Sequence, residues 1–365
     1  MNLKRSQTDA IGHIERYALS RVDKAKKTIE EVRSMCHISR DDLDGAVHHI
    51  KTSGRIALHF HPDRLDEEGK TVAKSLFETG LYKNQFETKL SNGMLSPYIG
   101  GPRDIWENNM FGKAYSSCDM PASERPKYGA LDLMRHADGP CPRFGSCYFL
   151  LKPEVSRRST FTYLDSSRDP REKGTLDIFE DILAGLLAEC FEREYALGKT
   201  NITPPGLINH LSGKLAVPFQ DPSNSPPTRN LNHCIEAQVH GDITLGNDVD
   251  ILVADPSFKE DPIGELFSHL CEKYGIQLFW HGGFRLRVPD VRSDFRGPSM
   301  PSLAERVAGT EWLNVNMIGQ AAQDLKRNPD KWKDRGTYEH CLQELKLLWH
   351  VLVKYGSSFS TTSGS

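Results

Sequence analysis

Apolar positions recur at helical spacing at both ends of the chain. Between residues 10 and 44 no proline or long polar gap interrupts this pattern, and Ser39 is a suitable N-cap for a helix over 40–50. From about residue 303 to 354 leucines again fall on one face of a helix. The pattern therefore predicts helical regions at the two ends of the chain.

The middle of the chain alternates short apolar runs with longer amphipathic ones. Pro62 stops the first short run, and Gly80 ends the helix expected after it. The predicted strands are 55–61, 85–90, 143–151, 159–164, 233–240, 249–254 and 276–280, and the predicted helices are 65–79, 176–197 and 262–274. This pattern indicates an α+β fold, with a body of short strands between helical ends.

The same pattern suggests how the chain is divided. We expect a helical region over 1–54, a core over 55–290, a second helical region over 291–355 and a disordered tail over 356–365, which is rich in Gly, Ser and Thr. Residues 218–230, rich in Pro, Ser and Asn, read as a surface linker inside the core.

Composition narrows the class of protein. The chain has 365 residues and a formal net charge of −3, which argues against a nucleic-acid binder that works by bulk charge. It has no apolar run of the roughly 20 residues that a membrane helix needs, and its N-terminus has no secretory signal. We expect a soluble cytoplasmic protein without membrane or nucleic-acid partners, although a non-classical secretion route stays open.

The eight cysteines are scattered and form no CxxC motif. This spacing argues against a zinc ribbon or a redox motif, and it predicts buried thiols rather than a disulfide framework.

The first candidate site is the pair His59 and His61 at the end of the first predicted strand. Side chains alternate along a strand, so both rings point to one side, as in many metal hydrolases. No second compact cluster of metal ligands accompanies the pair. We therefore expect no metal and favour a different role in the site for His61 or Arg64, with one histidine packed.

The second candidate lies in the loop-rich region that follows. The segment predicted as a strand over 85–90 leads into Ser91, Asn92 and Gly93, a turn sequence that exposes backbone N–H groups. Further on, 100–104 contains a Gly-Gly pair that opens a short helix carrying Trp106, an arrangement that can bind phosphate or simply form a capped helix.

The third candidate is the predicted strand over 233–240. Alternation places Cys234, Glu236, Gln238 and His240 on one face, opposite an apolar face. Such a polar row belongs either to a solvated sheet edge or to a cleft, where a carboxylate can stabilise an oxocarbenium-like centre.

These three clusters, in this order, resemble the mono-ADP-ribosyltransferase superfamily. That superfamily uses an Arg or His on its first core strand, a Ser/Thr motif on the second and a Glu on a later strand. The chain also resembles, over about residues 55–290, a microbial family of unknown function that is itself similar to divergent effector-type ADP-ribosyltransferases. The motifs that carry this resemblance are Phe60-His61-Pro62-Asp63-Arg64, Ser91-Asn92-Gly93, Gly100-Gly101-Pro102-Arg103-Asp104-Ile105-Trp106-Glu107, Lys127-Tyr128-Gly129-Ala130-Leu131, Pro142-Arg143-Phe144-Gly145-Ser146-Cys147-Tyr148 and Glu236-Ala237-Gln238-Val239-His240-Gly241.

The resemblance implies a split mixed β core and an NAD-dependent enzyme that transfers ADP-ribose to a side chain of a target protein. It makes Arg64 the residue that grips NAD, Ser91 the serine that supports the glutamate, and Glu236 the catalytic glutamate. In this reading NAD is the substrate, no metal takes part, and Phe86 or Tyr98 stacks on nicotinamide. The residues expected to contact NAD are His61, Arg64, Thr88, Ser91, Asn92, Gly93 and Gln238.

Several alternatives remain open at this stage. His61 can take the first-strand role in place of Arg64, and Ser159 can replace Ser91. Cys234 stands where arginine-modifying relatives carry Glu or Gln, and a register shift would put Gln238 in the catalytic position. Outside the superfamily, the alternatives are a metal-dependent hydrolase that uses His59 and His61, and a non-catalytic module that binds a nucleotide or a protein. The sequence identifies neither the target protein nor the oligomeric state.

Overall fold

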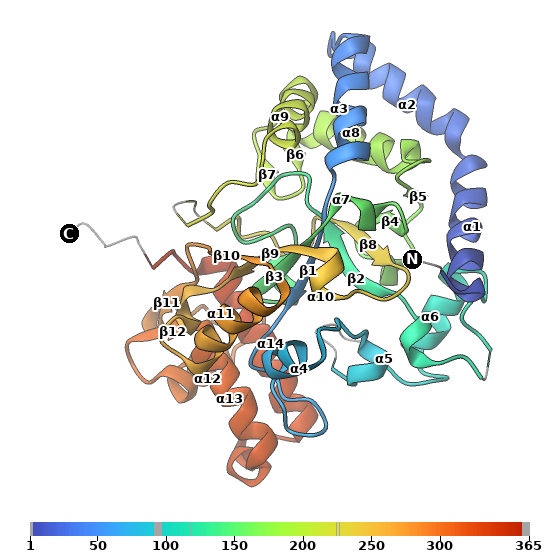
Figure 1. Ribbon diagram of the computed structural model, residues 1–365. Helices are drawn as coiled ribbons and strands as arrows, with labels where there is room; N and C mark the ends of the chain where they lie inside the picture. The colour runs from blue at the N-terminus through green and yellow to red at the C-terminus, as the bar shows by residue number, and fades with distance from the viewer. Residues whose placement is uncertain (1–2, 91–96, 118, 224, 226, 360–365) are drawn as a thin grey trace.

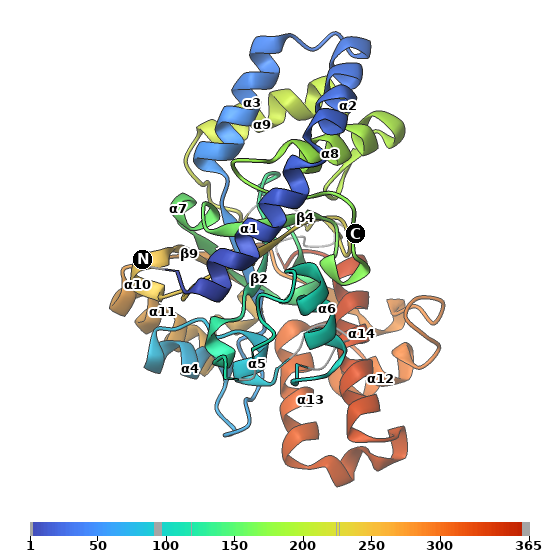
Figure 2. The same ribbon diagram turned by 90° about the vertical axis from the view of Figure 1, so that its right-hand side faces the viewer.

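An eight-stranded sheet runs through the middle of the protein, between a group of N-terminal helices and a group of C-terminal helices (Figure 1). The computed structural model describes residues 3–90, 97–117, 119–223, 225 and 227–359. The fold is α+β, as the sequence predicts, and the predicted helical ends are confirmed. In Figure 2, α2 and α3, with α8 and α9, lie at the top, α1 runs down across the middle, and α12 to α14 lie at the bottom.

The strand order of the sheet is β10-β9-β3-β1-β2-β8-β4-β5. All neighbours are antiparallel except β9 and β10, so the sheet is mixed. Two small two-stranded sheets, β6-β7 and β11-β12, lie outside it. The strands are β1 (Ile56–Phe60), β2 (Lys127–Leu131), β3 (Cys147–Leu151), β4 (Ser159–Tyr163), β5 (Lys173–Thr175), β6 (Tyr195–Ala196), β7 (Lys199–Thr200), β8 (Ile235–Val239), β9 (Val249–Ala254), β10 (Gln277–Trp280), β11 (Arg285–Arg287) and β12 (Trp312–Asn314).

Capping residues determine where several helices begin and end. Ser39 caps α3 by accepting from the backbone N–H of Asp42 at 3.0 Å, and Gly80 ends α4 in the left-handed conformation. The α-helices are α1 (Arg5–Leu19), α2 (Val22–Met35), α3 (Arg40–Ser53), α4 (Val72–Thr79), α5 (Gln85–Thr88), α6 (Pro102–Met110), α7 (Pro153–Ser156), α8 (Glu180–Arg193), α9 (Pro204–Ala216), α10 (Leu245–Asp248), α11 (Pro262–Tyr274), α12 (Met300–Ala308), α13 (Val315–Arg327) and α14 (Tyr338–Tyr355).

Several local predictions are wrong. The helix expected over 65–79 begins only at Val72, and the strand expected over 143–151 begins only at Cys147. The segment 85–90 holds the short helix α5 rather than a strand, because Asn84 caps it and Glu87 bonds back to the backbone N–H of Asn84 in a capping box. The first residues of the expected disordered tail are ordered, since Ser357 pairs with Arg285 of β11. Residues 360–365 lie outside the described residues.

One large hydrophobic core joins the N-terminal helices, the sheet and the C-terminal helices. It runs in sequence from Ala25 in α2 to Val353 in α14. β11 and β12 also pair across residue 290, where the sequence suggests a boundary. The division at 54, 290 and 355 stays a prediction.

The sheet is split between its two central strands. β1 and β2 share only the register pairs Ile56–Leu131 and Ala57–Ala130. Beyond these pairs β1 stays paired only with β3, as far as Phe60, and β2 stays paired only with β8, back to Lys127. A gap between β1 and β2 therefore opens toward the C-terminal end of β1, and this gap positions the candidate site.

Gly129 stands at the point where the two strands part, and this position requires a residue without a side chain. A Cβ added there would lie 2.6 Å from the carbonyl oxygen of Ala57, a backbone atom that cannot move alone. We expect Gly129→Ala to lower the free energy of unfolding by about 1–3 kcal/mol, measured by chemical denaturation. The matched control is Gly45→Ala, which meets open space in α3 and should raise stability by about 0.5–1 kcal/mol. Equal stability of the two variants would contradict this account of the split.

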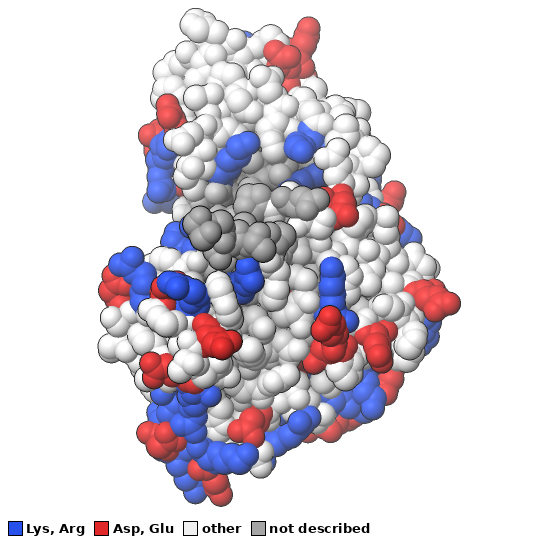
Figure 3. Space-filling view, turned by 90° about the vertical axis from the view of Figure 1, so that its left-hand side faces the viewer, with Lys and Arg blue, Asp and Glu red and all other residues white. Residues whose placement is uncertain are grey.

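None of the helices in the described part of the chain has the length and apolar character needed to cross a membrane. On the face shown in Figure 3, Lys and Arg side chains are interspersed with Asp and Glu. This mixture agrees with the near-neutral composition of the chain.

Candidate active site

A cavity of about 660 Å³ occupies the split between β1 and β2. Its size is typical of sites for cofactors and small substrates. The cationic residues among its described lining outnumber the carboxylates, so its charge favours an anionic ligand. The cations are Arg64, Lys83, Lys89, Arg103, Arg143, Arg168, Lys326 and Lys346, and the carboxylates are Asp66, Glu67, Asp165 and Glu236.

Glu236 lies on β8 in this cavity, with 6% of its surface exposed. Its carboxylate oxygen Oε1 accepts hydrogen bonds from the Ser166 hydroxyl and, at 3.1 Å, from the side-chain amide of Gln238. Burial and, next, the negative charge of Asp165 raise the pKa of Glu236 to about 7. A carboxyl group in a cavity with a pKa near neutrality is a candidate for acid–base or electrostatic chemistry.

An aromatic and cationic wall stands beside Glu236. The guanidinium of Arg103 lies 4.6 Å from the ring centre of Tyr128 and 5.3 Å from that of Trp106. The indole N–H of Trp106 donates to the carbonyl of Ser166 at 2.7 Å, which fixes the segment that also bonds to Glu236. The buried carboxylate of Glu107 binds both Arg103, at 3.3 Å, and the Tyr128 hydroxyl, at 2.9 Å. These contacts hold the wall rigid next to the carboxylate.

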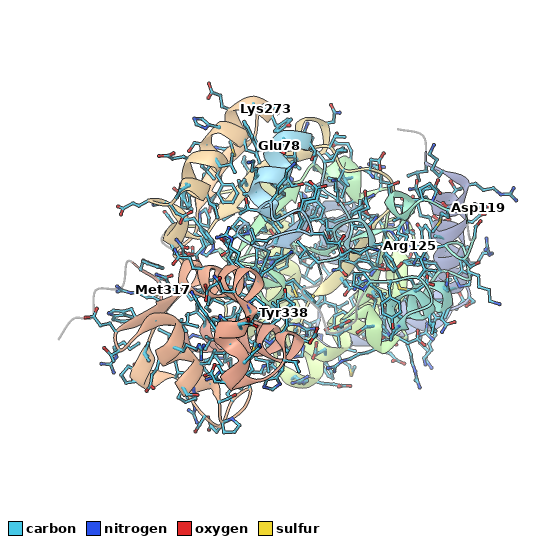
Figure 4. All side chains as sticks on the ribbon, turned by 90° about the horizontal axis from the view of Figure 1, so that it is seen from below. Glu78, Asp119, Arg125, Lys273, Met317 and Tyr338 are labelled. Atoms are coloured by element: carbon cyan, nitrogen blue, oxygen red, sulfur yellow. The ribbon has the colours of Figure 1, made fainter. Side chains whose placement is uncertain are left out.

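Arg64 also lines the cavity. It follows β1 rather than standing on it, because Pro62 ends the strand; its expected place on the first strand is therefore wrong. Its Nη1 atom is buried and has no hydrogen-bond partner among the described residues. Burial, and next the charge of Arg64, lower the pKa of Lys346 of α14 to about 8. Figure 4 shows Tyr338 of α14, which shares this lining, among the C-terminal helices and Arg125, behind the opposite wall, on the other side of the molecule.

His59 and His61, the two histidines of the first candidate site, both line the cavity. Nδ1 of His59 lies 3.0 Å from the carbonyl oxygen of Gly145, and its Nε2 accepts the backbone N–H of Cys141 at 3.2 Å. Burial lowers the pKa of His59 to about 3, so the ring is neutral and both nitrogens are engaged. His61 packs edge-on against Trp349, with ring centres 5.3 Å apart. Within the described ranges, no group of three His, Cys, Asp or Glu residues is placed to hold a metal ion.

Only part of the predicted second cluster can be located in the structure. Ser91, Asn92 and Gly93 lie outside the described residues. Thr88 lines the cavity, and its hydroxyl donates to the carbonyl of Asn84 at 3.1 Å. The second strand of the core is β2, not the segment before Ser91.

Of the remaining predicted residues, some line the cavity and others do not. Gln238 does not line the cavity, but its side-chain amide donates to Glu236. The alternative serine, Ser159, donates to the carbonyl of Val155 at 3.0 Å and does not line the cavity. Of the two aromatic residues, Phe86 is buried under Arg125 with 4.0 Å between ring centre and guanidinium carbon, whereas Tyr98 lines the cavity.

Cys234 contacts Cys141, which lines the cavity. The Cys234 thiol donates to the sulfur of Cys141 at 3.2 Å, and both are buried free thiols. The bond to Cys141 and burial raise the pKa of Cys234 well above its ordinary value. Cys234 therefore stays protonated at neutral pH and adds no charge beside Glu236.

Sequence reasoning missed four residues of this site: Ser166 and Asp165 beside Glu236, and Arg103 and Tyr128 in the wall. Arg103 and Tyr128 fall inside motifs that the sequence singles out, although no role was given to them. Ser166 follows a predicted strand and carries no motif, so only the tertiary structure identifies it.

Asp63 of the first motif has a structural position. It is 2% exposed, neither carboxylate oxygen finds a hydrogen-bond partner in the described part of the chain, and a Cβ on Gly319 of α13 would meet it. Burial raises the pKa of Asp63 from 3.8 to about 6. The carboxyl group is therefore harder to ionise in the folded protein than in the unfolded chain.

This shift predicts a pH-dependent loss of stability. The unfolded chain releases the Asp63 proton near pH 4 and the folded protein only near pH 6, so stability falls as pH rises through this window. We expect the free energy of unfolding of Asp63→Asn, relative to wild type, to increase by about 2 kcal/mol between pH 4.5 and 7.5, measured by denaturation. Glu67→Gln, at an exposed carboxylate four residues on, should show no such trend. A flat difference for Asp63→Asn would show that this carboxyl is ionised in the fold.

Comparison with known proteins gives a family but no activity. No curated protein matches the chain. The matching family is described as proteins of unknown function (DUF3626), and its profile covers residues 55–355. This confirms the resemblance to a family of unknown function, while the likeness to ADP-ribosyltransferases stays a proposal. Because the match covers most of the chain, the protein belongs to the DUF3626 family.

Proposed function

We propose that this protein is an NAD-dependent mono-ADP-ribosyltransferase that modifies a side chain of a target protein and releases nicotinamide. The observation that carries the proposal is the position of Glu236, a buried carboxylate facing the cavity at the split of the sheet. The chemistry needs a negative group near the ribose while positive charge develops there.

The strand arrangement supports the same reading. The superfamily that the sequence resembles draws its site from a first strand, a second strand and a later strand that carries the glutamate. Here β1, β2 and β8 are neighbours in the sheet, and Glu236 stands opposite Ala130 of β2. A cavity at the split between β1 and β2 is therefore within reach of all three strands.

The charges of the cavity fit a dinucleotide that lies across it. Arg64 and Lys346 form a cationic region, and a buried guanidinium nitrogen without a partner in the described chain favours a phosphate oxygen. In this arrangement the diphosphate lies toward Arg64, and the nicotinamide riboside lies toward Glu236 and the Trp106–Tyr128 wall.

The reaction follows from these positions. The bond between the ribose anomeric carbon and the nicotinamide nitrogen breaks, and its electron pair leaves with nicotinamide. Glu236 accepts a hydrogen bond from the ribose 2′-hydroxyl and offsets the charge of the oxocarbenium-like centre. A nucleophile of the target protein then attacks the anomeric carbon and loses its proton as the new bond forms.

The test is to incubate the purified protein with NAD carrying a label on the adenosine part and with a cell lysate, and to measure free nicotinamide and labelled protein together. Both signals are expected. Release of nicotinamide without a labelled protein would mean hydrolysis of NAD or a missing target. NAD binding without either product would favour the non-catalytic module. If the protein neither bound NAD nor turned it over, the proposal would be overturned.

A further inference from the structure

A chain of hydrogen bonds runs from the interior of the protein to the carboxylate of Glu236. The Tyr115 hydroxyl lies 2.6 Å from Nδ1 of His240, and Nε2 of His240 lies 3.2 Å from the Thr160 hydroxyl. Thr160 donates to the side-chain oxygen of Gln238 at 2.9 Å, and the amide nitrogen of Gln238 donates to Glu236. Neither the proposed reaction nor the sequence motifs give a role to Tyr115, His240 or Thr160.

The register of the sheet brings the members of this series of hydrogen bonds close together. Gln238 and His240 follow Glu236 at alternate positions along the β8 side of the sheet, and Thr160 of β4 stands directly opposite Gln238. Tyr115 reaches them from the segment after α6, where it packs with α1 residues in a separate small hydrophobic cluster. Gln238, His240, Thr160 and Tyr115 all have 0% of their surface exposed. Water does not compete for these bonds, so each group keeps the partner that the fold gives it.

With the Gln238 side chain oriented so that its oxygen faces Thr160, the positions of the other protons in this series of hydrogen bonds follow. Thr160 donates its single hydroxyl proton to Gln238, so it accepts a hydrogen bond from the Nε2–H group of His240. Burial lowers the pKa of His240 to about 3, so the ring carries one proton, and Nδ1 is left to accept the Tyr115 hydroxyl. Every group then donates toward Glu236.

We propose that Tyr115, His240, Thr160 and Gln238 are positioning residues that keep the Gln238 amide nitrogen on Oε1 of Glu236 and so leave Oε2 for the substrate. The Ser166 hydroxyl also ends on Oε1, and none of the described residues donates to Oε2. The inference rests on the proposed function for the meaning of the site, but the bonded chain itself can be tested without turnover.

Other groups around Glu236 also influence its pKa. Arg103 of α6 favours the charged carboxylate, whereas Asp165, after β4, opposes it. The hydroxyl of Tyr128 on β2 and the thiol of Cys234, which directly precedes β8, are neutral groups near it. None of these four is bonded to Thr160, so a change at Thr160 reaches Glu236 through Gln238.

The decisive variant is Thr160→Val, which keeps the shape of the side chain and removes the hydroxyl. Without that donor the Gln238 amide is free to turn its oxygen toward Glu236, which disfavours the carboxylate. The titration of Glu236 is followed by NMR of protein carrying ¹³C in the glutamate carboxyl groups, with the signal assigned by its loss in Glu236→Gln. We expect the midpoint to rise by about one pH unit.

Two variants test whether the effect belongs to this chain. Thr160→Ser restores the hydroxyl and should return the midpoint to that of wild type. Thr162→Val is the matched control, because Thr162 is on the same strand directly opposite Glu236 but donates to the carbonyl of Leu164 at 2.9 Å. Its midpoint should not move. If Thr160→Val does not fold, Tyr115→Phe breaks the chain at its far end and should give a smaller rise.

The two proposals fail in different ways. In an active enzyme, Thr160→Val should shift the acid limb of the kcat profile for nicotinamide release upward by the same amount and leave KM nearly unchanged. Absence of turnover in the wild type would overturn the proposed function. The NMR titration would still test the positioning role of the hydrogen-bonded residues. An unmoved midpoint in Thr160→Val, or an equal rise in Thr162→Val, would overturn the positioning role.

Discussion

Glu236→Gln is expected to abolish nicotinamide release almost completely while the protein stays folded and still binds NAD. The substitution keeps the size of the side chain and an oxygen that can accept from Ser166, but it removes the negative charge. A preorganised charge at a developing cation typically contributes a factor of about 10²–10³ to kcat, and we expect a loss of this order. The measurement is single-turnover release of nicotinamide, with NAD binding followed by calorimetry.

The control for this loss is Glu67→Gln, which removes an exposed carboxylate from the lining of the same cavity. It should retain most of the activity, because Glu67 has no contact with Glu236. If both variants were equally inactive, the effect would come from the overall charge of the cavity. Retained turnover in Glu236→Gln would remove this residue from the mechanism altogether.

The pKa of Glu236 gives this prediction a pH dependence with a definite sign. The raised value of about 7 means that the carboxylate, the form needed by the reaction, is lost as pH falls through neutrality. Nicotinamide release by the wild type should therefore decline about tenfold for each pH unit below this point. The residual activity of Glu236→Gln should lack this decline.

Much of the fold follows from local sequence. α3 and α11 begin at good caps, and the alternation of β8 places Glu236 and Gln238 on one face. The error at 85–90 is also local in origin, since a six-residue run suits either a strand or a turn of helix, and the capping box of Asn84 and Glu87 decides for the helix.

The candidate site is predictable only in part, because its geometry depends on contacts between distant segments. Alternation identified Glu236, but nothing near it in sequence reveals that Ser166 bonds to it or that Thr160 stands opposite Gln238. The polar face of β8 also turned out to be fully buried, which excludes the solvated edge that the pattern alone allowed. Burial of these groups is a property of the packed sheet, and periodicity cannot supply it.

The position of Arg64 leads to the second large expected effect. Its side chain lies in the cavity lining with Nη1 buried and unpaired within the described ranges, and it neighbours Lys346. A buried guanidinium N–H group without a hydrogen-bond partner is costly unless a ligand accepts from it, which is the situation of a phosphate site before its ligand arrives. Arg64 should therefore contribute to NAD binding far more than to the chemical step.

Arg64→Ala should raise KM for NAD about 10–100-fold and change kcat much less, since each charge-assisted hydrogen bond contributes about 1.5–3 kcal/mol and 1.4 kcal/mol corresponds to a factor of ten. Initial rates over a range of NAD concentrations separate the two constants. Lys83→Ala, which removes an exposed cation from the same lining, should change KM by less than about threefold. An unaltered KM in Arg64→Ala would assign the binding of NAD to another group. His61 would be the next residue to replace, because it belongs to the same motif and also lines the cavity at the end of β1.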